Sequence, residues 1–151
     1  APVGGWRVGH AYEDGRIRLM LALWVEHLWH CAVAAEPAPA GSMWCLREGR
    51  AGFRALAPDE ARARLAELLS WYGQGLCQPL HFFPRSAESL LESGPAAARR
   101  TWLGSGGGVR IRGESHDAAW RILMRGVADP LAGSFAGLAQ GILGPLREAR
   151  Q

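Results

Sequence analysis

Hydrophobic residues recur at helical spacing over residues 16–35. They fall three and four positions apart, which places them on one face of a helix. That face is formed by Leu21, Trp24, Val25, Leu28, Trp29 and Ala32. Pro37 and Pro39 predict the end of the helix. Because most of its circumference is apolar, we expect this helix to be central to the fold.

Residues 58–76 show the same spacing behind a helix start. Pro58 suits a first turn, and Asp59 and Glu60 favour the positive end of the helix dipole. The predicted buried stripe consists of Ala61, Leu65, Leu68, Leu69 and Tyr72. Gly73 and Gly75 predict the end of this helix.

Shorter helical patterns occupy the second half of the chain. Ser86 is a candidate cap for one helix, Pro95 opens another through Leu103, and Ser115 or Asp117 can cap a third. A last helix is predicted to start at Asp129-Pro130 and to stop at Gly144-Pro145. Its hydrophobic face consists of Leu131, Phe135, Leu138 and Ile142.

Short alternating or turn-bounded segments predict strands between these helices. Residues 1–15 suit an edge strand, and residues 43–56 read as a hairpin around Glu48-Gly49. In residues 109–112, Arg110 and Arg112 alternate with apolar residues and give a strand with one basic face. The expected fold class is α+β, or an α/β-like arrangement, with helices packed on a small mixed sheet.

The connector Pro79–Ala87 joins the helix over 58–76 to the next one. Phe83 precedes Pro84, so it is expected to be extended rather than helical. Two adjacent rings on a proline-pinned connector favour burial. We therefore predict that Phe82 or Phe83, at least one of them, is buried against the 58–76 helix.

Composition limits the chemistry open to the chain. Its 151 residues suit one domain, which we expect to be a fragment of a longer chain. All 17 basic residues are arginine, a bias typical of a GC-rich genome, and the net charge is +3. Without lysine the chain has no Walker-A loop, Schiff base or nuclease motif ending in lysine. Three widely spaced cysteines predict reduced thiols, and no segment resembles a membrane span or signal peptide.

Three groups of residues are candidates for metal or phosphate binding, and each also has a simpler structural explanation. His27, His30 and Cys31 share neighbouring helix faces and are all zinc ligands by type, although packing around tryptophans explains them better. Glu114 and Asp117 resemble the start of a magnesium site, but helix capping by Asp117 is the stronger interpretation. The glycine-rich run 104–108 suits a flexible loop better than a phosphate cradle.

Four arginines fall within sixteen residues of one another: Arg110, Arg112, Arg121 and Arg125. Such a cluster suits phosphate contacts with DNA. Solvated faces or salt bridges between subunits fit the same residues equally well.

Four blocks of the sequence resemble the C-terminal region of the RecC family, the gamma subunit of bacterial exodeoxyribonuclease V. They are Leu23–Ala34, Leu68–Ala87, Val109–Trp120 and Asp129–Leu146. The second block matches a family pattern at Tyr72, Gly75, Pro79, Leu80, Phe82, Phe83, Pro84, Ser86 and Ala87. The third matches at Arg112, Gly113, Glu114, Asp117 and Trp120.

The resemblance implies a domain with a degenerate PD-(D/E)xK nuclease fold and no catalytic or metal-binding residue. RecC proteins form a heterotrimer with RecB and RecD that unwinds and degrades DNA from double-strand ends. ATP and Mg²⁺ are then expected only in the partner subunits, in the bacterial cytoplasm and away from membranes. The implied role is subunit docking, with DNA guidance as a further function. An active nuclease with an atypical site and a DNA-independent adaptor are the alternatives.

Overall fold

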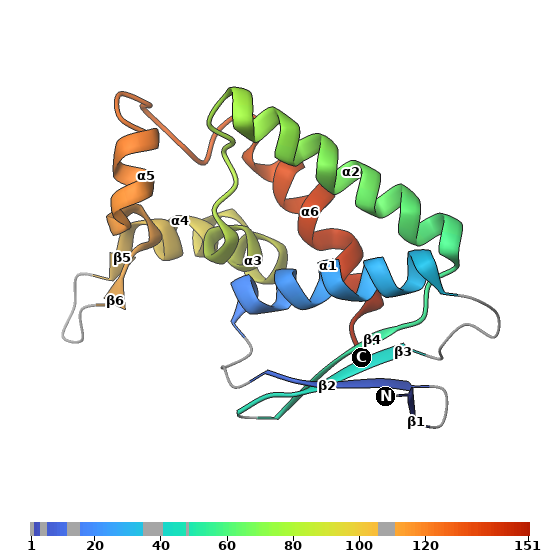
Figure 1. Ribbon diagram of the computed structural model, residues 1–151. Coiled ribbons are helices and arrows are strands. Elements are labelled where there is room, and N and C mark those ends of the chain that lie inside the picture. Colours follow the sequence, from blue (N-terminus) through green and yellow to red (C-terminus); the bar gives the residue numbers. More distant parts are fainter. Residues whose placement is uncertain (1, 4–5, 12–15, 35–40, 48, 106–110) are drawn as a thin grey trace. The chain divides into compact units, whose positions relative to one another are not determined.

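The computed structural model describes residues 2–3, 6–11, 16–34, 41–47, 49–105 and 111–151 (Figure 1). The strands are β1 (Pro2–Val3), β2 (Trp6–His10), β3 (Gly41–Cys45), β4 (Arg50–Arg54), β5 (Gly104–Ser105) and β6 (Ile111–Arg112). The helices are α1 (Ile17–Val33), α2 (Pro58–Cys77), α3 (Pro84–Ser93), α4 (Pro95–Leu103), α5 (Ala118–Leu123) and α6 (Phe135–Ala149), with the 3-10 turn η1 at Glu114–His116. The fold is mixed α and β, as the sequence predicts.

The chain forms two compact units. Unit 1 comprises Ala1–Gly73 and Pro145–Gln151, and unit 2 comprises Gln74–Gly144. Two helices, α2 and α6, continue from one unit into the other.

Unit 1 contains a four-stranded mixed sheet in the order β1-β2-β3-β4. β2 and β3 are parallel, with Trp6 opposite Gly41 and His10 opposite Cys45, while β1 and β4 pair antiparallel to their neighbours. Helix α1 connects the two parallel strands, as such a crossover requires, and lies along one face of the sheet (Figure 1). The predicted hairpin over 43–56 is confirmed as β3 and β4, and Gly49 has the positive φ that its turn needs.

The buried face of α1 differs from the predicted stripe. Trp24 and Leu28 are buried as expected, but Val25 and Trp29 are 45% and 59% exposed. The buried positions shift by one helical row and include His27 and Cys31. Trp24, Phe53 and Trp44 pack ring to ring beneath the helix, so aromatic contacts with the sheet decide which face is covered.

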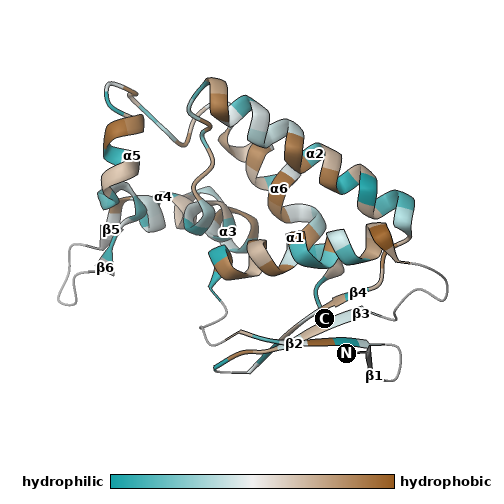
Figure 2. Cartoon of the chain, viewed as in Figure 1, coloured by the Kyte–Doolittle hydropathy of each residue, from teal (hydrophilic) through white to brown (hydrophobic). Residues whose placement is uncertain are grey.

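Helix α2 also departs from its prediction. It continues through Gly73 and Gly75 to Cys77, and only Ala61 on it is buried. Leu69 and Tyr72, which were expected in the core, are 67% and 65% exposed. Figure 2 shows α2 changing from hydrophilic at its start to more hydrophobic toward its end, where no charged residue follows Glu67.

Unit 2 is built from α3, α4, η1, α5, the β5–β6 hairpin and most of α6. Helix α4 matches its predicted bounds, and Gly94, with φ of +82°, allows the tight link from α3. The last helix was predicted to start at Asp129-Pro130 and to break at Gly144-Pro145. Instead it begins at Phe135 and passes through Pro145 to Ala149. Of the predicted strand over 109–112, only Ile111–Arg112 lies within the described residues, as does only Gly104–Ser105 of the glycine-rich run.

Candidate functional site

The start of α3 is held by a carboxylate from a distant part of the chain. Oε1 of Glu114 accepts a hydrogen bond from the backbone N–H of Arg85 at 3.1 Å. Its Oε2 accepts from the backbone N–H of Ser86 at 2.7 Å and from the Ser86 hydroxyl at 2.8 Å. Glu114 is only 2% exposed. A negative charge at this position satisfies otherwise unpaired N–H groups and lies at the positive end of the helix dipole.

This arrangement corrects the predicted cap of α3. The helix begins at Pro84 with Phe83 as its N-cap residue, and Phe83 is extended as expected before proline. Ser86 lies inside the first turn and donates its hydroxyl to Glu114 rather than capping its own helix. No local sequence signal predicts this contact, because Glu114 and Ser86 are 28 residues apart.

Phe83 forms the centre of an aromatic cluster in unit 2. The side chain is fully buried, and its ring centroid lies 4.2 Å from that of Trp102, 5.0 Å from Trp120 and 5.9 Å from Phe135. The prediction that one of the two phenylalanines is buried is therefore confirmed. These ring contacts are with α4, α5 and α6, and packing against the 58–76 helix stays a prediction.

The two motif blocks that the sequence singled out thus meet in space. Phe83 of the Pro79–Ala87 block contacts the ring of Trp120 in the RGE..D..W block. Ser86 of the former block donates a hydrogen bond to the Glu114 carboxylate of the latter. Gly113 has a further reason to be glycine. A Cβ at this position would clash with the backbone of Trp102 and Leu103.

Asp117 performs the role that the sequence favoured for it. Its Oδ1 accepts a hydrogen bond from the backbone N–H of Ala119 at 3.0 Å and so caps α5. The two acids of the nuclease-like pattern therefore hold two different helix starts. Among the residues described, no group of three or more His, Cys, Asp or Glu side chains has a metal-binding arrangement.

An open groove lies beside the aromatic cluster within unit 2. It has a volume of about 480 Å³ and is lined by Gly75, Leu76, Cys77, Gln78, Pro79, Leu80, Phe82, Trp120 and Leu123. None of these residues is charged. The groove lining includes four family-motif positions of the second block and Trp120 of the third block. The motif residues therefore contribute to a surface groove as well as to the buried core.

The predicted arginine cluster is only partly visible. Arg110 lies outside the described residues, whereas Arg112, Arg121 and Arg125 are exposed. Arg112 is on β6, and its carbonyl accepts a hydrogen bond from the Arg85 guanidinium at 3.5 Å. Arg121 is on α5, and Arg125 lies two residues beyond the end of that helix.

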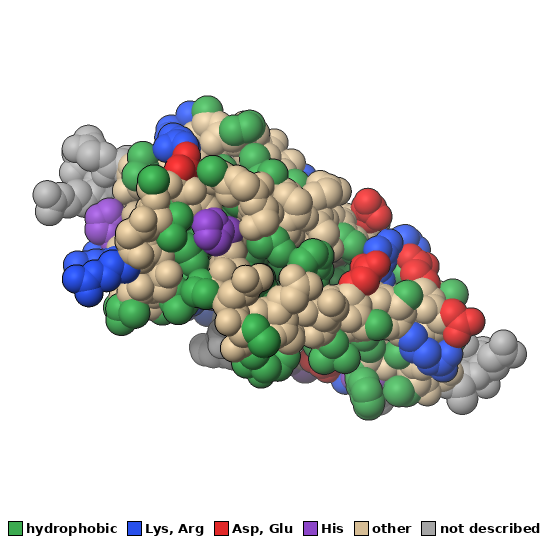
Figure 3. Space-filling view, turned by 90° about the horizontal axis from the view of Figure 1, so that it is seen from above, with side chains coloured by type: hydrophobic (Ala, Val, Ile, Leu, Met, Phe, Trp, Pro, Cys, Tyr) green, Lys and Arg blue, Asp and Glu red, His purple; other side chains and the backbone are tan. Residues whose placement is uncertain are grey.

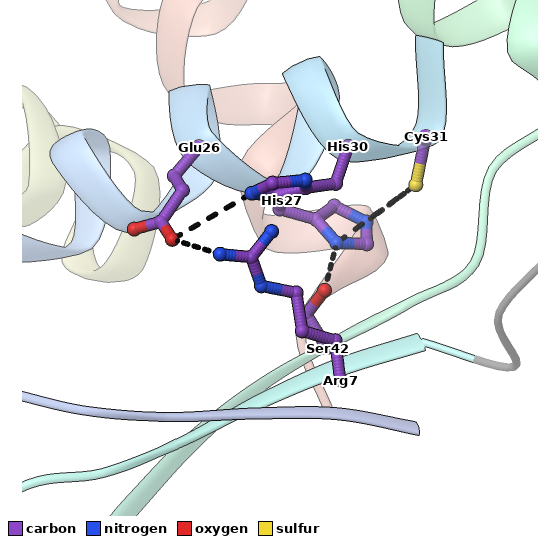
Figure 4. A network of polar contacts seen from close by, with 6 residues as sticks. All are labelled: Arg7, Glu26, His27, His30, Cys31 and Ser42. Carbon is purple, nitrogen blue, oxygen red and sulfur yellow. Dashed lines mark hydrogen bonds and ion pairs between the residues drawn. The ribbon is translucent and has the colours of Figure 1, made fainter. Parts of the chain in front are cut away.

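His27 and Cys31 belong to a buried network in unit 1 (Figure 4). His27 Nε2 lies 2.9 Å from the carbonyl oxygen of Arg54, which can only accept, so this nitrogen carries the proton. Nδ1 is then the acceptor for the Ser42 hydroxyl, at 2.9 Å. His27 therefore ties α1 to both β3 and β4, and its two ring nitrogens are occupied by protein groups.

Burial governs the titration of this network. Desolvation lowers the pKa of His27 to about 4, helped by the charges of His30 and Arg54 and opposed by the hydrogen bond to the Arg54 carbonyl. Burial also raises the pKa of the Cys31 thiol. Close by, Arg7 of β2 pairs with Glu26 of α1 at 2.7 Å, and burial lowers the pKa of His30 (Figure 4). A neutral histidine and a protonated thiol form a structural link between helix and sheet.

Comparison with known families identifies the chain. The family model described as RecC C-terminal domain matches residues 3–95, which is more than half of the sequence. The match includes the blocks Leu23–Ala34 and Leu68–Ala87 and ends before the other two. No curated protein matches the chain. Within the described residues, no helix has both the length and the hydrophobicity needed to cross a membrane. By its family match, the chain belongs to the RecC C-terminal domain family.

Proposed function

We propose that this chain is the non-catalytic, nuclease-like domain of the gamma subunit in a RecBCD-type helicase–nuclease. Membership of the RecC family places its function in that complex, which acts in recombination and DNA repair. In this proposal the domain docks RecB-like and RecD-like subunits and helps to guide double-stranded DNA ends. ATP and Mg²⁺ act in the partner subunits, in the bacterial cytoplasm. The two compact units are parts of one domain.

One observation supports the non-catalytic role above the others. A metal-dependent nuclease needs carboxylate oxygens that are available to the metal. Both oxygens of Glu114 instead accept hydrogen bonds from α3, and the side chain is almost fully buried. Asp117 is engaged at the start of α5. The two acids that resemble a nuclease motif therefore act as hydrogen-bond acceptors at the starts of α3 and α5.

The direct test is Mg²⁺-dependent cleavage of linear duplex DNA by the purified chain. We expect no cleavage above a protein-free control, and no heat of Mg²⁺ or Mn²⁺ binding by calorimetry. Robust cleavage that disappears in Asp117→Asn would overturn the proposal. This substitution retains the side-chain oxygen that caps α5, so loss of activity would not reflect unfolding. Glu114→Gln provides a second variant at the other acid.

DNA guidance rests on the exposed arginines Arg112, Arg121 and Arg125. Contacts with phosphates release counterions, so binding to DNA ends should weaken steeply with salt. Replacing Arg121 and Arg125 together by alanine should weaken binding and reduce the salt slope by about one to two, measured by fluorescence anisotropy between low and moderate salt. Binding with no salt slope, or none at all, would favour the DNA-independent adaptor role.

A further inference from the structure

Both helices that continue from one unit into the other carry helix-weakening residues at the crossing. The boundary between the units falls after Gly73 in α2 and after Gly144 in α6. The sequence predicts helix ends at these same places, from Gly73 and Gly75 in the first helix and from Gly144-Pro145 in the second. Both helices nevertheless continue, to Cys77 and to Ala149. Residues that disfavour a helix therefore stand at both links between the units.

The crossing in α2 is exposed on all sides. Every residue from 72 to 79 is exposed, with Tyr72 at 65% and Leu76 at 70%. The backbone is helical there, since the N–H of Gln78 donates to the carbonyl of Gln74 at 3.0 Å. With so little burial, this turn depends mainly on helix propensity, which each glycine lowers relative to alanine.

The ion pairs within α2 precede the crossing. Arg62 pairs with Asp59 at 2.7 Å and Arg64 with Glu67 at 3.2 Å, each across one helical turn. Acidic and basic side chains lie together toward the right of Figure 3, the side on which α2 begins in Figure 1. Beyond Glu67 the sequence of α2 has no charged residue, so no ion pair within the helix can support the crossing.

The crossing in α6 contains a proline. Pro145 has no N–H to donate to the carbonyl of Gly141, and its ring crowds that carbonyl, which weakens and kinks a helix. The chain is attached on either side of this point to a different unit. The ring of Phe135 contacts that of Phe83 in unit 2, whereas the N–H of Gln151 donates to a β4 carbonyl in unit 1 at 3.0 Å. Bending between these attachments is easiest at Pro145.

We propose that residues 73–75 of α2 and 144–145 of α6 form a double hinge, on which the two units reorient while each unit stays folded. The inference goes beyond the proposed function and does not depend on it. A hinge needs only a few residues that absorb the change in backbone angles, and both links provide them at the unit boundary. Hinge motions of this kind occur on the microsecond to millisecond timescale.

Distances between spin labels on the two units test the hinge. The labelled chain carries Arg50→Cys on β4 and Arg100→Cys on α4, two exposed positions in different units. Cys45→Ser and Cys77→Ser remove the accessible thiols, and the buried Cys31 remains. Double electron–electron resonance on frozen samples then measures the distribution of distances between the units, which should be broad.

The variant Gly73→Ala with Pro145→Ala, made in this same background, stiffens both crossings. A Cβ at Gly73 would meet nothing within 4 Å, and alanine at 145 restores the missing donor. The double variant should narrow the distance distribution about twofold, and each single substitution should narrow it less. Gly137→Ala is the matched control, because Gly137 is an exposed glycine of α6 inside unit 2 with open space around it. It should leave the width unchanged, and circular dichroism checks that all variants are folded.

Three results would overturn the inference. A second label pair inside unit 2, Arg100→Cys with Arg125→Cys, gives the width of a rigid unit, and an equally narrow distribution between the units would mean that the helices do not bend. An equal width with and without the double substitution would place the motion elsewhere. Equal narrowing by Gly137→Ala would assign the effect to general stabilisation of α6. None of these results bears on subunit docking or DNA guidance.

Discussion

Glu114 is the residue whose removal should disturb unit 2 most directly. Its carboxylate accepts three hydrogen bonds, two from backbone N–H groups at the start of α3 and one from the Ser86 hydroxyl. In Glu114→Ala these donors lose their acceptor inside the protein. The positive end of the α3 dipole also loses its compensating charge.

The expected loss of stability follows from these contacts. A buried donor left unpaired costs about 1–3 kcal/mol. The Ser86 N–H is buried, the Arg85 N–H is partly buried, and the hydroxyl is free to rotate toward another acceptor. We therefore expect Glu114→Ala to lower the free energy of unfolding by about 3–5 kcal/mol, out of a total of about 5–15 kcal/mol for a domain. Glu114→Gln keeps one carbonyl oxygen and should lower it by about 1–2 kcal/mol.

Urea denaturation followed by tryptophan fluorescence measures this difference. Glu92→Ala is the control, because Glu92 is an exposed acid near the other end of the same helix. It should change the free energy of unfolding by less than about 0.5 kcal/mol. A loss below about 1 kcal/mol in Glu114→Ala would refute the view that this carboxylate joins the two motif blocks.

Two further predictions concern the aromatic cluster and the buried histidine. Phe83→Ala should lower the free energy of unfolding by about 3–5 kcal/mol, because this ring is fully buried. Phe82→Ala, at a half-buried site, should lower it by less than half of that. Urea denaturation measures both losses, and equal losses would contradict the packing described. The pKa of His27 is lowered from 6.5 to about 4, so the unfolded chain binds the proton more readily than the folded one. The contribution of neutral His27 to the free energy of unfolding should therefore be fully present above pH 6.5 and decrease as the pH drops toward 4. The expected loss is at most about 3 kcal/mol. Melting temperatures measured at pH 7 and pH 4.5 check this, and the pH-dependent loss should be smaller in His27→Gln. A loss of the same size in that variant would assign the effect to other groups.

Several elements could be predicted from the sequence because their signals are local. The hydrophobic spacing of α1, the Pro58 start of α2 and the hairpin of β3 and β4 all depend on residues that are neighbours along the chain. Asp117 was predicted as a cap for the same reason, since it bonds a backbone group two residues away. The family was predicted from Pro79–Ala87, and the family match includes that block.

The failures share a different physical origin. Val25 and Trp29 fit a helical stripe, but the face that α1 buries is chosen by aromatic contacts with β3 and β4. Leu69 and Tyr72 fit a stripe on α2 as well, yet they remain exposed. Periodicity identifies an apolar face but does not show whether anything covers it.

By itself the sequence determined the helices, the hairpin, the absence of a lysine-dependent mechanism and the family. The tertiary structure decided what the motif residues do. Only there does Glu114, which resembles a nuclease acid, become the buried acceptor at the start of α3, and only there do Leu76, Leu80 and Phe82 line one groove. Both depend on segments far apart in the chain, and the free energy of such contacts comes from burial and hydrogen bonds that local sequence patterns do not record.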